Sequence, residues 1–135
     1  MKPEYFNTKD ACGLPGLLGL KITEIEKNSA KAELTVEKKH LAVNGYLHAG
    51  AVITLADTAA GSGCMANLPE GASSFTTIEL KSNFMSTVKE GLIYCTAKCI
   101  HSGKSTQIWE SIVHCAKSKK IMAKFTCTQF ILYPR

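Results

Sequence analysis

The stretch NGYLHAGAVITLAD, residues 44–57, decides how this chain is expected to fold. Gly45 and the His48-Ala49-Gly50 step are typical of a turn that leads into a helix, and the apolar residues after them suit that helix. The first backbone N–H groups of a helix lack partners within it and attract negative charge, so this start can stabilise an oxyanion. The run ends on one carboxylate, Asp57. Taken alone, Asp57 is interpreted either as a reactive group or as a buried structural carboxylate paired with His48 or a lysine.

Ala49 and Asp57 are too far apart in one helix to act on the same atom. They are eight residues apart, which is about 12 Å along the axis at 1.5 Å per residue. A nucleophile or base and an oxyanion donor must both come within about 3 Å of the reacting group. The carboxylate of one chain is therefore expected to act with the helix start of a second copy, and the motif predicts a homodimer.

The remaining sequence has the patterns of one helix and several strands. The apolar spacing predicts a helix over 49–66, in which Gly61 and Gly63 indicate either close approach by another backbone or a ligand, or a frayed end. Strands are expected at residues 20–25, 30–36, 75–85, 92–101, 106–115 and 121–132. A single apolar helix cannot bury itself, so the sheet must curl around it. The expected fold is α+β, an antiparallel sheet around one long central helix, in a single domain over 1–135.

Composition narrows the possible partners and compartments. The chain has 16 basic and 11 acidic residues, a net charge of +5, which suits anionic ligands such as phosphorylated cofactors. The lysines stand in short pairs typical of solvated turns, so nucleic acid is not an expected partner. Residues 1–7 contain an acid and a proline where a signal peptide needs an apolar region, and no apolar run is long enough to cross a membrane. A soluble, cytoplasmic protein without membrane contact is expected.

The six cysteines show neither C-x-x-C spacing nor the density of a secreted disulfide scaffold. Most are expected to be buried thiols. Cys95, Cys99 and His101 share a parity in one expected strand, so a metal site there is the minor alternative to a packed strand face.

Two short segments carry a resemblance to a known family. Residues 45–50 read G-Y-L-H-A-G, which corresponds to the pattern G-x-x-H-G-G except at Ala49, and residues 55–57 read L-A-D, which matches the pattern L-A-D. With the order of the expected elements, the chain resembles the hotdog-fold acyl-CoA thioesterases, in particular their phenylacetate-degradation-type branch. The resemblance covers nearly the whole chain. It implies a hotdog fold, a homodimer paired further into a homotetramer, and an acyl-CoA substrate.

The resemblance also implies roles for individual residues. Asp57 would be the nucleophile or general base. The backbone N–H of Ala49, aided by Gly50, would polarise the thioester carbonyl. His48 would shape the turn, and Thr77 matches the Ser/Thr position beside the carboxylate. No metal or other cofactor is implied.

The chain departs from the family pattern at two positions. The first Gly after the His is Ala49, which keeps its N–H but adds a methyl group that narrows the space near the carbonyl. The family often has Asn or Gln six residues before the His, where this chain has Ala42, and Asn44 is the candidate substitute.

The turn Gly103-Lys104-Ser105 lacks the earlier glycine of a P-loop. This turn is either a plain hairpin turn or a place where Lys104 contacts the phosphates of coenzyme A.

The implied function is hydrolysis of aryl- or medium-chain acyl-CoA thioesters. Tyr46, Leu47 and Phe84 near the motif would suit such acyl groups and would equally suit the core. One alternative is a hotdog acyl-CoA dehydratase or hydratase, which would need a His acting with an acid on the carbon chain. The other is a non-catalytic acyl-CoA-binding protein, which would not need Asp57.

Overall fold

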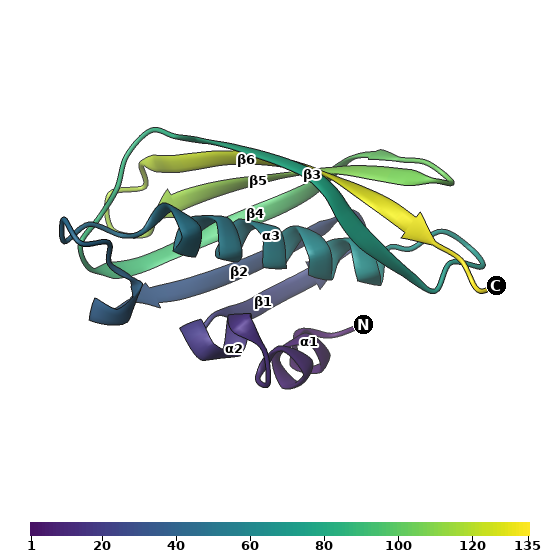
Figure 1. Ribbon diagram of the computed structural model, residues 1–135, viewed down its shortest axis with the longest axis horizontal. Coiled ribbons are helices and arrows are strands. Elements are labelled where there is room, and N and C mark those ends of the chain that lie inside the picture. The colour runs from purple at the N-terminus through teal and green to yellow at the C-terminus, as the bar shows by residue number, and fades with distance from the viewer.

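The protein is built on one antiparallel sheet whose strands lie in the order β1-β2-β4-β5-β6-β3. The computed structural model describes residues 1–135, and Figure 1 shows the sheet curving around a long helix. The strands are β1 (Lys21–Glu26), β2 (Ser29–Val36), β3 (Ser74–Phe84), β4 (Gly91–Ser102), β5 (Thr106–Cys115) and β6 (Ile121–Leu132). The expected α+β fold is confirmed, and each of the six predicted strands lies within one residue of its predicted bounds.

Helix α3 (Ala49–Ala66) lies against the concave face of the sheet (Figure 1). Its predicted bounds are confirmed. Small side chains let it approach the strands closely, since Ala56, Ala59 and Ala60 are buried against them. Ser111 of β5 donates a hydrogen bond to the carbonyl of Ala56 at 2.9 Å, which satisfies a buried hydroxyl at this contact. The helix is therefore held in one position relative to the sheet.

Gly63 marks a close approach by a side chain, where another backbone or a ligand was expected, and it does not lie at a frayed helix end. A Cβ atom there would lie 2.6 Å from the ring of Trp109, which is fully buried. The indole N–H of Trp109 donates to Gln107 at 2.7 Å, so the ring cannot easily shift. Glycine is therefore required by packing at this point of α3.

Gly63→Ala is expected to destabilise the protein by about 1–3 kcal/mol, since it overpacks the core. This holds although Ala favours a helix interior by about 1 kcal/mol over Gly. Gly61→Ala is the matched control, because its added Cβ would meet only the half-buried ring of Phe75, at 3.1 Å. Urea unfolding of both variants measures the effect. A Gly63→Ala protein as stable as the wild type would contradict the packing argument.

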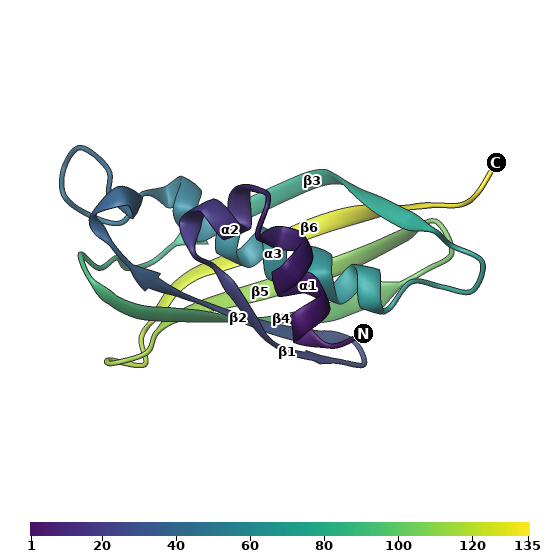
Figure 2. The same ribbon diagram turned by 90° about the horizontal axis from the view of Figure 1, so that it is seen from below.

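Two short helices at the N-terminus, α1 (Pro3–Asp10) and α2 (Leu14–Leu18), were not expected from the sequence. Figure 1 shows them below β1, and Figure 2, which views the molecule from below, shows them in front of α3. Asn7 bonds both backbone groups of Ile22, donating to its carbonyl at 2.9 Å and accepting from its N–H at 2.8 Å. Side-chain groups thus pair with the free edge of β1, and α1 covers that edge. A 3₁₀ helix, η1 (Lys38–His40), follows β2.

The opposite edge of the sheet, β3, is uncovered. Leu80 and Phe84 are 41% and 45% exposed. They pair in register with Cys127 and Ala123 of β6, which are buried under the helix layer, so Leu80 and Phe84 project from the same face of the sheet as α3. An apolar edge strand with free backbone groups is a ready surface for pairing with another strand.

The structure also bears on two expectations about membranes and metals. None of the helices combines the length and the apolar character that crossing a bilayer requires.

The metal site considered in β4 needs Cys95 and Cys99 to share a face with His101, and this expectation is wrong. The register of β4 shifts between Cys99 and His101, so Cys99 pairs with inward-facing Trp109 while His101 is exposed and pairs with Ile108.

Candidate active site

Asp57 lies in the middle of α3 and carries an unpaired carboxylate. The side chain is half-buried, and its Oδ1 atom is buried without a hydrogen-bond partner. The ion pairs of the chain are Lys31–Glu24 and Lys124–Glu110, so no cation of the chain pairs with Asp57. Burial raises the pKa of the carboxyl above its ordinary value of 3.8. A structural carboxylate would be paired, so these features favour a reactive group or a ligand contact.

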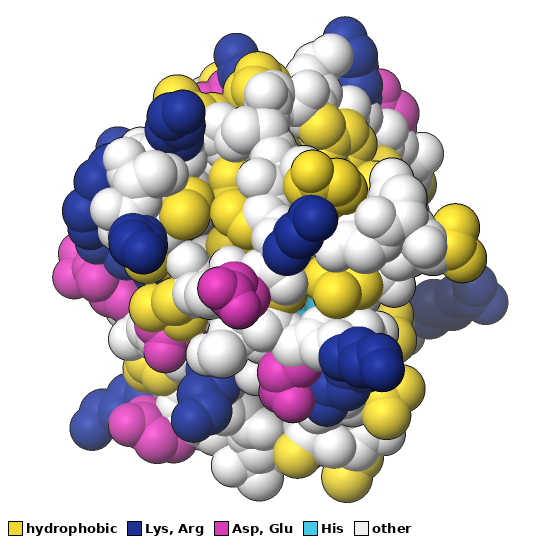
Figure 3. Space-filling view, turned by 90° about the vertical axis from the view of Figure 1, so that its left-hand side faces the viewer, with side chains coloured by type: hydrophobic (Ala, Val, Ile, Leu, Met, Phe, Trp, Pro, Cys, Tyr) yellow, Lys and Arg dark blue, Asp and Glu magenta, His cyan; other side chains and the backbone are white.

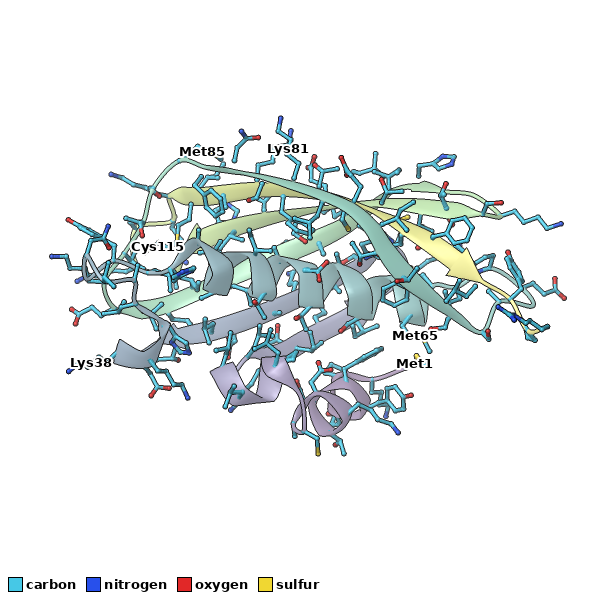
Figure 4. All side chains as sticks on the ribbon, in the orientation of Figure 1. Met1, Lys38, Met65, Lys81, Met85 and Cys115 are labelled. Atoms are coloured by element: carbon cyan, nitrogen blue, oxygen red, sulfur yellow. The ribbon has the colours of Figure 1, made fainter.

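A cavity of about 350 Å³ contains Asp57 and Thr77 on its wall. The hydroxyl of Thr77 donates to the side-chain carbonyl of Gln129 at 2.7 Å, and Gln129 is fully buried. This bond fixes the hydroxyl and leaves its oxygen able to accept a hydrogen bond from a ligand or water. The residues that line the rest of the cavity are Tyr5, Phe6, Lys9, Asp10, Pro15, Thr58, Gly61, Ser62, Met65 and Phe75. Figure 4 labels Met65 on α3, above the N-terminal helices.

The start of α3 exposes one free backbone donor. His48 is the N-cap, and its Nδ1 accepts the N–H of Gly50 at 2.8 Å. No backbone carbonyl accepts the N–H of Ala49, which is exposed. The N–H of Gly50, expected to aid Ala49, is thus already occupied by His48. Ala49 remains as the donor that can polarise an oxygen at this helix start.

Asn44 belongs to the same region as Ala49. Both line a second cavity, of about 310 Å³, together with Tyr46, Leu47 and Phe84. The Oδ1 atom of Asn44 accepts the N–H of Tyr46 at 3.1 Å, so this oxygen stabilises the turn. The amide N–H groups of Asn44 form no hydrogen bond with the protein. They are the part of Asn44 that a ligand in this cavity can use.

The two groups of predicted residues do not meet within one chain. Asp57 and Thr77 line the first cavity, Ala49 and Asn44 line the second, and the two cavities share no residue. Each chain therefore carries two incomplete halves of the predicted site. This agrees with the separation of about 12 Å along the helix expected from 1.5 Å per residue.

The turn Gly103-Lys104-Ser105 lies at the other end of α3 from Ala49. Beside it, Gln107 donates to the carbonyl of Asn67, the C-cap of the helix, at 2.8 Å. The N–H of Gly103 donates to Thr106 and the carbonyl of Ser105 accepts from Ile131, so these backbone groups are occupied. The Lys104 side chain is exposed and forms no ion pair. Its ammonium group is therefore available to a ligand.

The end of the molecule at which α3 begins is rich in lysine. Figure 3 looks onto this end and shows Lys and Arg side chains, interspersed with Asp and Glu, around apolar patches. Val88 accepts the N–H of Leu47, which places the loop between β3 and β4 beside the helix start. The lysines of the neighbouring loops and turns are Lys38, Lys39, Lys89, Lys117, Lys119 and Lys120. Their positive potential favours an anionic ligand near Ala49.

Comparison with known proteins identifies the family. A model described as the thioesterase superfamily matches residues 44–122, which include α3 and both groups of predicted site residues. The chain belongs to the thioesterase superfamily. This thioesterase is 34% identical over 116 residues to a 1,4-dihydroxy-2-naphthoyl-CoA hydrolase of Listeria monocytogenes, covering 86% of the chain and 93% of the relative. It is 25% identical over 107 residues to the Escherichia coli 1,4-dihydroxy-2-naphthoyl-CoA hydrolase, covering 79% and 78%.

Solved structures show the same fold. A thioesterase mutant from Pseudomonas aeruginosa superposes on this thioesterase with a TM-score of 0.91 at 20% identity, covering 98% of the chain and 94% of the other. The hotdog fold and thioester hydrolase activity expected from the resemblance are therefore confirmed. The phenylacetate-degradation-type branch stays a prediction.

The stability of this thioesterase is expected to depend on pH through Asp57. Burial makes the folded protein hold this proton more tightly than the unfolded chain does, so folding binds a proton between the two pKa values. The contribution of Asp57 is full below about pH 3.8 and is lost as the pH rises through the raised, folded pKa. Asp57→Asn never charges and should melt a few degrees higher than the wild type at pH 7.

Thermal unfolding at a series of pH values measures this difference, which should vanish near the acid end of the range. Glu70→Gln is the control, because Glu70 is exposed and shows no such burial. A lower melting temperature for Asp57→Asn at pH 7 would show that the carboxylate stabilises the fold instead.

Proposed function

We propose that this protein is an acyl-CoA thioesterase that hydrolyses aryl- or medium-chain acyl-CoA to the free acid and coenzyme A. The observation that carries the proposal is Asp57, an unpaired carboxylate with a raised pKa in a cavity of about 350 Å³. A cavity of this size is within the range of small-molecule sites. The names of the two bacterial relatives, both aryl-CoA hydrolases, support an aromatic acyl group.

In this proposal Asp57 acts on the thioester carbonyl as nucleophile or general base. As nucleophile, its carboxylate attacks the carbonyl carbon, the C–S bond breaks, coenzyme A leaves as the thiolate, and water then hydrolyses the anhydride. As general base, it takes a proton from the water that attacks the same carbon. Thr77, held by Gln129, orients the water or the carboxylate through its free lone pair. Burial helps both routes, since it removes the water that would solvate the carboxylate.

The oxyanion that forms on the carbonyl is assigned to the N–H of Ala49 of a second chain. His48 positions this donor by capping the helix, and Asn44 reaches the substrate through its amide. The positive end of α3 adds to the effect of the single N–H. Such donors contribute about 2.7–4 kcal/mol to the stabilisation of a transition state.

The proposed assembly is a homodimer formed along β3. Its backbone edge is free, and Leu80 and Phe84 extend the apolar face beyond the area that α3 covers. Antiparallel pairing of two β3 strands would run the two α3 helices side by side in opposite directions, with the middle of each near the start of the other. The outer face of the sheet carries Ile108 and exposed Phe130, a surface on which two dimers would pair into the homotetramer.

Coenzyme A is expected to place its phosphates near lysines. The lysines around the start of α3 lie at the end of the molecule that carries Ala49. Lys104 of the same chain lies at the opposite end of the molecule. In an antiparallel dimer the Lys104 turn of one chain lies beyond the helix start of its partner, by the nine residues from Asp57 to Ala66 or about 14 Å. Lys104 would then add its charge to the same phosphates, while Gly103 and Ser105 shape the turn.

The test is release of free thiol from a panel of aryl- and alkyl-acyl-CoA substrates. The proposal predicts release by the wild type, fastest for aryl groups. An enoyl-CoA substrate that gains water without releasing thiol would favour the hydratase instead. Binding of every acyl-CoA without thiol release would favour the acyl-CoA-binding protein. Either result would overturn the proposal.

A further inference from the structure

The cavity that contains Asp57 is closed on one side by the N-terminal segment. The N-terminal wall of the cavity consists of Tyr5, Phe6, Lys9 and Asp10 of α1 and Pro15 of α2. Figure 2, which views the molecule from below, shows both helices in front of α3. Residues 1–43 lie outside the region matched by the family model, so this wall is not part of what that model describes. A substrate preference that distinguishes this chain from other members of the superfamily would therefore depend on the residues of this wall.

Specific contacts hold the N-terminal wall against the rest of the chain. Phe6 is 6% exposed and anchors α1 in the core. Asn7 bonds both backbone groups of Ile22 on β1. Tyr5 packs edge-on against Phe6, with ring centroids 5.2 Å apart. A wall held at these points presents its polar side chains in a defined position, which selectivity requires.

Asp10 is the residue of this wall whose charge is not balanced by any contact within the chain. It is the last residue of α1, where the helix dipole disfavours a negative charge. It is half-buried, and its carboxylate forms neither an ion pair nor a hydrogen bond with the protein. Burial raises the pKa of this carboxyl. The nearest cation in sequence, Lys9, lies over the ring of Tyr5 at 5.8 Å.

We propose that Asp10 accepts a hydrogen bond from a hydroxyl group on an aromatic acyl chain. The ring of that chain packs against Phe75 and Met65, between α3 and the N-terminal wall. Asp10 is then a specificity-determining residue, and the enzyme prefers hydroxylated aryl-CoA thioesters to their unsubstituted counterparts. The inference rests on the proposed function, because it assigns the acyl group of that substrate to this cavity.

The chemistry of the cavity favours a ring with a hydrogen-bond donor, such as a hydroxyl, over a ring without one or with an anionic group. A carboxylate oxygen is an acceptor only, so it pairs with O–H or N–H donors and repels an anion. A ring without a donor would desolvate Asp10 and leave it unpaired, which costs binding free energy. A carboxylated ring would instead need Lys9 to leave Tyr5. A hydroxylated ring supplies such a donor without any movement of Lys9.

The test compares matched substrates on the wild type and on variants of Asp10. The pairs are 4-hydroxybenzoyl-CoA with benzoyl-CoA, and 1,4-dihydroxy-2-naphthoyl-CoA with 2-naphthoyl-CoA. A hydrogen bond to a charged group predicts a wild-type preference of about 10- to 100-fold in kcat/KM for the hydroxylated member. Asp10→Ala should reduce this ratio to about one and Asp10→Asn to an intermediate value. Glu4→Gln, an exposed carboxylate on the same helix, should leave the ratio unchanged.

A binding measurement separates this inference from the proposed function. Non-hydrolysable thioether analogues of the same substrate pairs are titrated by calorimetry into the wild type and the Asp10 variants. Selectivity of binding that depends on Asp10 supports the inference even if no thioester is hydrolysed, in which case only the proposed function fails. Equal ratios for the wild type and Asp10→Ala in both assays overturn it. A preference for a carboxylated ring that is lost in Lys9→Ala overturns it as well, since the wall would then select through its cation.

Discussion

Asp57→Asn is expected to lose at least about a thousandfold in kcat on every acyl-CoA that the wild type hydrolyses. Asn has nearly the same shape but can neither attack a carbonyl as a carboxylate nor take a proton from water. Asp57→Ala should lose as much. Binding should survive, because the cavity that receives the acyl group keeps its walls in both variants. Steady-state rates of thiol release, with binding of a thioether analogue as the second readout, measure the two effects.

A matched control separates loss of chemistry from loss of charge. Glu70→Gln removes a carboxylate from an exposed position after α3 and should leave kcat unchanged. Unfolding curves should show that the Asp57 variants remain folded, since Asn at this position is expected to stabilise the protein. Turnover by Asp57→Asn within about tenfold of the wild type would remove Asp57 from the mechanism.

Ala49→Pro is expected to lower kcat by about 100- to 1,000-fold, the loss seen when one oxyanion donor is removed. Proline has no N–H, yet it is well tolerated at the first position of a helix, which Ala49 occupies. The preceding residue, His48, has a ψ of 134°, the extended conformation that a following proline requires. The substitution therefore removes one donor at little cost to the fold.

Ala49→Gly is the control for this variant. It keeps the N–H and removes only the methyl group, so it should retain activity or gain some on bulky acyl groups. Thiol release by the three proteins, with unfolding curves beside it, decides the matter. If Ala49→Pro turned over as fast as Ala49→Gly, the oxyanion would have to be stabilised elsewhere.

Local patterns predicted the regular elements of this fold because most of them bury one face. Apolar and polar residues alternate along 30–36, and apolar residues recur every three or four positions along 49–66. Both patterns arise because one face of the element is buried against the core. Helix α1 has no such signal, since Phe6 is its only buried residue. It is held by the pairing of Asn7 with Ile22, a contact between segments that no local pattern contains.

The candidate site was predictable only in part, for the same reason. The motif around His48 and Asp57 is local, and both the cap and the unpaired carboxylate are present in the structure. The occupied N–H of Gly50 follows from the rotamer of His48, which sequence does not specify. Gln129 could have been noticed as a polar residue on the core-facing side of its strand. Asp10 could not, because it joins the cavity only through the packing of α1.

The shared site between two chains is the central claim, and mixed dimers test it most directly. Asp57→Asn and Ala49→Pro chains with different tags are coexpressed, and dimers that carry both tags are purified. A mixed dimer should hold one site with both defects and one site with none, and so show about half of the wild-type kcat per dimer. Each variant alone should be nearly inactive. Mixed dimers as inactive as either parent would contradict a site built from Asp57 of one chain and Ala49 of the other.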